Sequence, residues 1–198
     1  MKKQLKTKTN LINKKITIKR FAEVCGADEE RVEKWTGLFD LERELCAESY
    51  ASGRANYVKI QHAICELSNG WLEYGGQGKG KPDFYYGLQQ SWGETKAYHK
   101  DKRYADVAAS AFFASNSRVP EYRRLLKVDA EKADRFLFEH SYDKNEMYCL
   151  TSTSKLSVPF EEIELIFVEK DVLVSCLKPD NRRKVDMQKL MQKVEAYE

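Results

Sequence analysis

The hydrophobic period of this chain changes at Trp71, and this change limits the folds that the chain can adopt. Over residues 55–68, apolar side chains recur at helical spacing. After Trp71, short runs rich in aromatic residues over 71–74, 84–88 and 92–99 are typical of strands. Helices followed by strands of this kind predict a mixed α/β (α+β) domain, with helices packed on a central sheet.

The first 70 residues are predicted to be all-helical, with a further helix over 38–50. Residues 1–20 carry eight lysines and arginines and no acidic residue, so this arm either contacts phosphates or frays as a solvated terminus. Residues 17–35 resemble a helix-turn-helix unit, in which Gly26 permits the turn and Asp28 caps the second helix. A DNA-contacting unit and a purely structural helical hairpin are both open interpretations of this segment.

Beyond residue 100, predicted helices alternate with predicted strands. The helical segments are 104–114, 121–126 and a closing helix over 187–194. The strand-like segments are 134–140, 147–151, 163–168 and 172–176, of which the last two predict a terminal hairpin.

The composition indicates the environment of the chain. Charged residues make up 33% and hydrophobic residues 42%, as in globular proteins, and no apolar run approaches the roughly 20 residues that span a bilayer. The five cysteines have no CxxC spacing, which argues against a disulfide framework and a zinc knuckle. We therefore expect free thiols, a cytoplasmic location and no membrane partner.

Three charged side chains point to chemistry. Asp83 precedes one predicted strand, and Glu94 and Lys96 lie on one face of the next. If these strands pair antiparallel, the two carboxylates approach each other, and a cation such as Mg²⁺ relieves their repulsion. An adjacent lysine can orient a water or offset developing negative charge. Glu94-Thr95-Lys96 is also the one acid-x-Lys triplet in the sequence.

Pro82-Asp83, ten intervening residues and then Glu94-Thr95-Lys96 resemble the signature of the PD-(D/E)XK nuclease superfamily. The predicted order of helix, three strands, helix and strand over about residues 55–152 is similar to the core of that superfamily. The resemblance implies a restriction-endonuclease-like mixed sheet over 51–198, preceded by a basic arm and helical subdomain over 1–50. It also implies that Asp83, Glu94 and the carbonyl of Thr95 bind Mg²⁺, while Lys96 acts as general base or electrostatic stabiliser.

The sequence departs from the family pattern on the helix before the first strand. Many members carry a glutamate near the start of that helix, where this chain has Asn56. Gln61 and Glu66 lie further along, and a capping or surface role is the leading interpretation of Glu66. The identity of a second metal ligand therefore stays open among these three residues.

The resemblance implies duplex DNA as the substrate and, most specifically, a type II restriction endonuclease acting as a homodimer. The basic side chains expected to contact phosphates are Lys79, Lys81, Lys100, Lys102 and Arg103. A further basic cluster comprises Arg118, Arg123 and Arg124. Two alternatives are a structure-specific resolvase or transposon-end nuclease, and a non-catalytic helix-turn-helix regulator.

Overall fold

Ten strands form two sheets in the described part of the chain. The computed structural model describes residues 10–45, 56–76, 81–106, 119–129, 131–133, 135–136, 145–153, 159–178 and 181–197. The main sheet has the order β10 (Glu195–Ala196), β1 (Lys14–Thr17), β7 (Glu164–Glu169), β6 (Asn145–Thr151), β4 (Ser91–Ala97), β3 (Phe84–Tyr86), β2 (Leu72–Tyr74). The small sheet has the order β5 (Tyr104–Asp106), β9 (Asn181–Asp186), β8 (Leu177–Lys178).

The main sheet is mixed. Strands β2, β3 and β4 pair antiparallel, β4 pairs parallel with β6, and β6 pairs antiparallel with β7. A β-bulge shifts the β4–β6 register between Trp92 and Gly93, one residue before Glu94. Bulges re-aim side chains, so this irregularity lies where a site would use it. The predicted mixed α/β architecture is confirmed.

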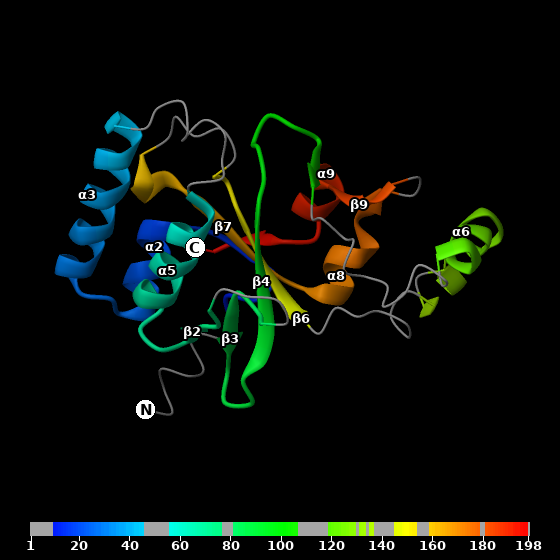
Figure 1. The fold of residues 1–198 in the computed structure, drawn as a ribbon, viewed down its shortest axis with the longest axis horizontal. Coiled ribbons are helices and arrows are strands. Elements are labelled where there is room, and N and C mark those ends of the chain that lie inside the picture. The colour runs from blue at the N-terminus through cyan, green and yellow to red at the C-terminus, as the bar shows by residue number, and fades with distance from the viewer. Residues whose placement is uncertain are drawn as a thin grey trace.

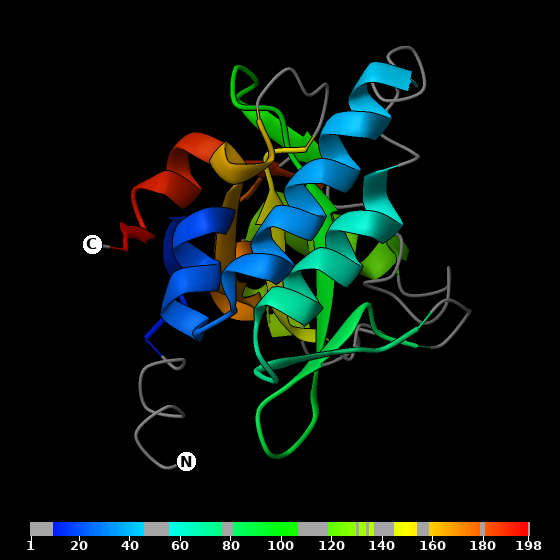
Figure 2. The ribbon, with the colours of Figure 1, turned by 90° about the vertical axis from the view of Figure 1, so that its left-hand side faces the viewer.

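Helices cover both faces of the main sheet (Figures 1 and 2). The described helices are α2 (Ile18–Cys25), α3 (Glu29–Leu45), α5 (Asn56–Leu67), α6 (Val119–Val128), α8 (Lys170–Ser175), α9 (Met187–Met191) and the 3₁₀ turn η3 (Phe160–Glu162). The first three share a core with one face of the sheet, where Phe21 stacks on Phe167 at 5.3 Å between ring centroids. The other face buries Tyr148 and Leu150 with α8, α9 and the small sheet.

Local signals account for the α2–α3 hairpin. The Thr17 side chain accepts a hydrogen bond from the Arg20 amide, Gly26 ends α2 at φ 72°, and the Asp28 carboxylate accepts from the Arg31 amide at 2.9 Å. A left-handed residue after a helix is most stable as glycine. The predicted turn and cap are confirmed, although α3 runs unbroken to Leu45 instead of ending near residue 35.

Four predicted elements are wrong in the described residues. The first 70 residues are not all-helical, because Lys14–Thr17 forms β1 beside β7. Tyr104–Asp106 is strand β5 rather than the start of a helix, because β9 pairs with it. Of the predicted strand over 134–140, residues 135–136 are helical instead of extended, and the other residues lie outside the described part of the chain. Lys170–Ser175 is helix α8 rather than a strand, since Leu173 and Val174 are buried against the sheet from a helical backbone.

Most predicted strands are present with shifted ends. Those near 71–74, 84–88, 92–99, 147–151 and 163–168 correspond to β2, β3, β4, β6 and β7. The closing helix α9 stops at Met191. Residues 107–114 of the predicted alanine-rich helix lie outside the described residues. No helix in the described ranges is long and apolar enough to cross a membrane.

Candidate active site

Asp83 lies at the point where β3 and β4 stop pairing. The β3–β4 ladder ends at Phe84 opposite Gly93, and the Asp83 amide donates to the Gly93 carbonyl at 3.1 Å. One step further along β4, the Thr95 amide donates to Asp83 Oδ2 at 2.8 Å. The side chain of Asp83 therefore takes the place of the missing strand neighbour and is anchored to the edge of β4.

Glycines permit this close approach. A Cβ atom on Gly93 would lie 2.0 Å from Phe84 Cε2, so the Phe84 ring covers the backbone of β4 beside the site. A Cβ atom on Gly75 would lie 2.1 Å from the Pro82 carbonyl oxygen, and the Gly75 amide donates to the Asp83 carbonyl at 3.0 Å. The backbone on both sides of Asp83 is thus closely packed against its neighbours.

Thr95 turns its backbone and its hydroxyl in different directions. The N–H and C=O of one strand residue lie at the same strand edge, so the Thr95 carbonyl faces the gap that Asp83 occupies. The side chain projects to the face that also holds the buried Met147 and Cys149. There Oγ1 is fully buried and has no hydrogen-bond partner among the described residues. The carbonyl, and not the hydroxyl, is the Thr95 oxygen that a ligand beside Asp83 can reach.

Glu94 and Lys96 form an ion pair on the opposite face of β4. The Lys96 Nζ atom lies 2.5 Å from Glu94 Oε1, and both side chains are less than a quarter exposed. The residues paired with them across β6 are Tyr148 and Leu150, which belong to the second core. The pair is therefore partly buried but still accessible to a ligand.

The pKa of the Asp83 carboxyl is raised to about 6. Burial is the main cause and the negative charge of Glu94 is the second, while the Thr95 amide, Lys96 and Gln61 oppose the shift. Two neighbouring carboxylates also attract a divalent cation. The electrostatics of the site thus favour a positive ligand between Asp83 and Glu94.

The structure distinguishes the three residues considered for a second ligand. Gln61, which is 1% exposed on α5, hydrogen-bonds to the Asp83 carboxylate. Glu66 instead accepts from Lys34 at 2.9 Å and from the Trp35 indole at 2.9 Å, which ties α5 to α3. The side chain of Asn56 lies outside the described residues. Gln61 is the helix residue at the site, and no local pattern in the sequence distinguishes it.

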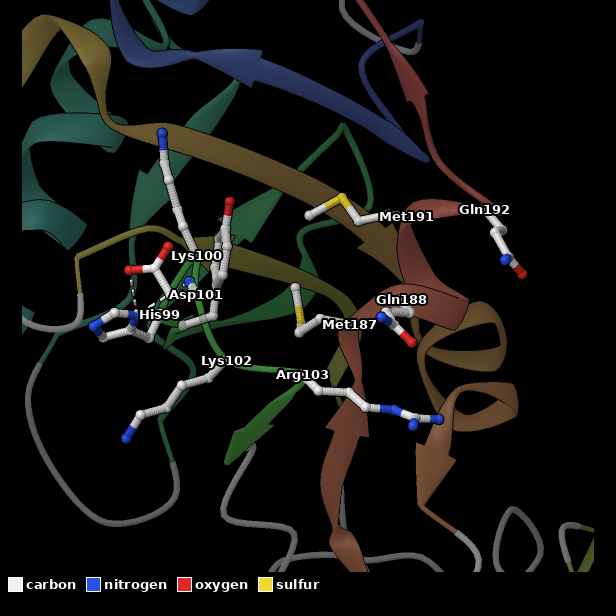
Figure 3. Close-up of a pocket in the computed structure, with 10 residues that line it drawn as sticks. His99, Lys100, Asp101, Lys102, Arg103, Met187, Gln188, Met191 and Gln192 are labelled. Atoms are coloured by element: carbon white, nitrogen blue, oxygen red, sulfur yellow. Dashed lines mark hydrogen bonds and ion pairs between the residues drawn. The ribbon is translucent and has the colours of Figure 1, made fainter.

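The residues expected to contact phosphates lie in two places. Lys81 is exposed two residues before Asp83, and Lys79 lies outside the described residues. Lys100, Lys102 and Arg103 follow β4 and line a pocket of about 690 Å³ between the 98–103 loop and α9 (Figure 3). Arg118 lies outside the described residues, whereas Arg123 and Arg124 belong to α6, which stands to the side of the sheet (Figure 1).

Asp83, Glu94 and Thr95 suit a hard cation that is bound by few protein ligands. In the described ranges, no three His, Cys, Asp or Glu side chains are grouped as a metal cage. Asp83, Glu94 and the Thr95 carbonyl supply two carboxylates and one backbone oxygen. Mg²⁺ typically binds through one or two carboxylates, keeps several waters and adds substrate phosphate, so this donor set is chemically suitable.

Comparisons with known proteins do not assign this chain to a family. No family model, no curated protein and no solved structure matches it. Function must therefore be argued from the site itself.

Proposed function

We propose that this protein is a Mg²⁺-dependent endonuclease that hydrolyses phosphodiester bonds of DNA. The observation that carries the proposal is the anchoring of Asp83 to the Thr95 amide at 2.8 Å, beside the Glu94–Lys96 ion pair. This arrangement brings two carboxylates, one backbone carbonyl and one ammonium group together beside β4. The pattern of residues, the succession α5, β2, β3, β4 and the parallel pairing of β4 with β6, which follows β5 and α6 in the chain, support a PD-(D/E)XK nuclease as the class.

Each residue has a distinct role in the proposed reaction. Asp83, Glu94 and the Thr95 carbonyl would hold the cation, which supplies Lewis-acid polarisation of the phosphate and a more acidic bound water. Lys96 orients the attacking water or deprotonates it, and its charge offsets the negative charge that develops on phosphorus-bound oxygens. Gln61 holds the Asp83 carboxylate in place. Hydrolysis leaves a 5′-phosphate and a 3′-hydroxyl.

As the particular activity we propose a type II restriction endonuclease, cytoplasmic and homodimeric, that cuts duplex DNA at a defined sequence. A two-fold symmetric dimer matches a palindromic site. The support is the run Glu94-Thr95-Lys96-Ala97-Tyr98 followed by Lys100, Lys102 and Arg103, which extends the strand of the reacting groups into a basic loop.

The charge of α3 weighs against the regulator that reads DNA through α2 and α3. Residues 29–45 carry six acidic and three basic side chains. A helix in the major groove lies between phosphates, so a net negative helix is repelled there. In addition, Trp35 and Phe39 of α3 are buried in the core. These features favour a structural helical hairpin.

Incubation of plasmid DNA with Mg²⁺ and with EDTA tests the proposed function. Cutting with Mg²⁺ and intact plasmid with EDTA are expected, and discrete fragments with constant end sequences would identify a site-specific enzyme. Intact plasmid with Mg²⁺, Mn²⁺ and Co²⁺ alike would contradict the proposal.

A further inference from the structure

The pocket beside α9 continues the face of β4 that carries the reacting groups. Side chains alternate along a strand, so Glu94, Lys96 and Tyr98 project from the same face. Tyr98 follows Lys96 by two residues, about 7 Å along the strand, and it lines the pocket. If a phosphate of a nucleic-acid strand lies at Glu94 and Lys96, the neighbouring nucleotide of that strand therefore reaches the pocket.

The lining combines groups that suit different parts of a nucleotide. The thioethers of Met187 and Met191 stand across from the His99–Lys102 loop (Figure 3). Met187 is only 6% exposed, but the partly exposed Met191 offers a polarizable apolar surface to a flat ring, and the exposed amide of Gln188 can bond a base edge. The volume of about 690 Å³ lies in the range of roughly 300–1,000 Å³ found for sites of small ligands.

Positive charge is available at the mouth of the pocket. Arg103 donates to Asp186 at 2.9 Å yet stays 55% exposed, and Lys100 lies 3.3 Å from Glu164. Lys102 is exposed and forms no ion pair with any described residue. A phosphate can therefore approach Lys102 without displacing an internal partner.

Basic residues are frequent in the sequence segment that contains α9. Residues 178–193 contain six lysines and arginines and two aspartates, whereas the complete chain has a net charge of only +3. This segment includes α9, which forms one side of the pocket. An extended polyanion, rather than a single small anion, matches charge distributed over that length.

We propose that the pocket receives an unstacked nucleotide of the substrate strand, next to the phosphate that is cut. In a duplex both faces of each base are covered by stacking, so the methionine surface can meet a base only where the strand is unpaired or the base is extruded. The inference rests on the proposed nuclease function. It specifies DNA in which the nucleotide beside the cut phosphate is extruded from the duplex or already unpaired, so a single strand, which needs no unpairing, enters the pocket most readily.

Binding without catalysis tests this proposal. Fluorescence anisotropy of the full chain in EDTA would compare a labelled 12-nucleotide single strand with the same strand annealed as a blunt duplex. Purely electrostatic binding favours the duplex, because its charge density is higher. We expect the single strand to bind about tenfold more tightly, since stacking of one base supplies that much.

Two variants locate the binding in the pocket. Lys102→Ala should weaken single-strand binding about fivefold and reduce the magnitude of the log Kd against log salt slope by about 0.7. Met191→Trp, which fills the pocket, should reduce binding of the single strand to the level of the duplex. Lys132→Ala removes an exposed lysine outside the pocket and should leave both affinities unchanged.

Equal or tighter binding of the duplex would overturn the proposal, as would unchanged single-strand binding by Lys102→Ala and Met191→Trp. Because Met191 is partly buried, circular dichroism must show a folded variant, and Lys102→Ala decides if Met191→Trp does not fold. These outcomes do not depend on cleavage. A single-strand preference in EDTA with intact plasmid in Mg²⁺ would contradict the nuclease function alone.

Discussion

At the scale of single residues, the site depends on what the backbone of β4 offers to Asp83. The Thr95 amide holds one carboxylate oxygen of Asp83, and Gln61 bonds the same carboxylate from α5. The charge of Glu94 and burial act in the opposite direction and raise the proton affinity of Asp83. The position of Asp83 is therefore fixed while its charged form is disfavoured, which is typical of groups at functional sites.

Thr95→Val tests whether the backbone of Thr95, and not its hydroxyl, serves the site. Oγ1 is buried without a hydrogen-bond partner among the described residues, and a methyl group of similar size removes that unsatisfied atom. We expect the free energy of unfolding to stay equal or rise by up to about 2 kcal/mol, with plasmid cleavage retained. Denaturant titration and cleavage assays measure both, and loss of cleavage in a folded variant would assign the metal-binding role to the hydroxyl.

Asp83→Asn tests whether the charged carboxylate of Asp83 destabilises the metal-free protein. The pKa of about 6 exceeds the ordinary value of 3.8, so protonation of Asp83 favours the folded state. This stabilisation is complete below pH 3.8 and is lost as the pH rises through 6, a difference of about 3 kcal/mol. At pH 8 in EDTA the variant should therefore melt at a higher temperature than the native chain.

The gain from Asp83→Asn should shrink as the pH falls from 7 to 4, because Asp83 itself becomes neutral. Thermal unfolding in EDTA across this range measures the difference at each pH. Glu131→Gln, at an exposed position, is the matched control and should show no such trend. A constant difference between Asp83→Asn and the native chain at all pH values would contradict the account.

At the scale of elements, local residue patterns predicted some strands and missed others. Strands β3 and β4 were predictable because their aromatic residues and the turn between them are local signals. Helix α8 was not, because Val172, Leu173 and Val174 suit a strand equally well and only their tertiary contacts decide. Strand β5 depends on pairing with β9, about 80 residues later in the chain, which no local pattern reveals.

The same limit applies within the candidate site. The spacing of Asp83, Glu94 and Lys96 is visible in the sequence, whereas the contact between Gln61 and Asp83 depends on how α5 packs on the sheet. Glu66, the acidic candidate on that helix, turns toward Lys34 and Trp35 instead. A prediction that considers only acidic side chains therefore selects Glu66 instead of Gln61.

Gly93→Ala tests the packing that keeps β3 and β4 together beside the site. The new Cβ would overlap the Phe84 ring, which is fully buried and has little space to move. We expect a loss of about 2 kcal/mol or more in the free energy of unfolding, together with reduced cleavage. Gly37→Ala is the matched control: its Cβ meets no atom within 4 Å, and alanine in α3 should add about 1 kcal/mol. Equal stability of the two variants would contradict this role of Gly93.

At the scale of the whole molecule, the N-terminal segment is joined to the rest through the main sheet. Strand β1 lies between β10 and β7, and it pairs with β7 at four positions. Phe21 of α2 packs on Phe167 of β7 and lies near Trp71, with ring centroids 5.3 and 6.1 Å away. The helices of the N-terminal part thus form one wall of the core beneath the site.

Deletion of residues 1–50 should therefore abolish folding of the remainder. The fragment 51–198 would expose the edge of β7 and the aromatic surface that Phe21 covers, and both favour aggregation. Circular dichroism and thermal unfolding should show no cooperative transition. A fragment that unfolds cooperatively and cleaves DNA would show instead that 51–198 is an independent domain.

The rate of DNA cleavage by matched variants tests the central claim most directly. In Mg²⁺, Asp83→Asn, Glu94→Gln and Lys96→Ala should each lower the single-turnover rate by about a hundredfold or more, since in the proposed mechanism the first two remove a cation ligand and the third removes the positive charge that stabilises the transition state. Glu131→Gln and Lys132→Ala change the same residue types at exposed positions and should retain the native rate. Equal rates for the two sets of variants, all folded, would show that the three residues do not carry out the reaction.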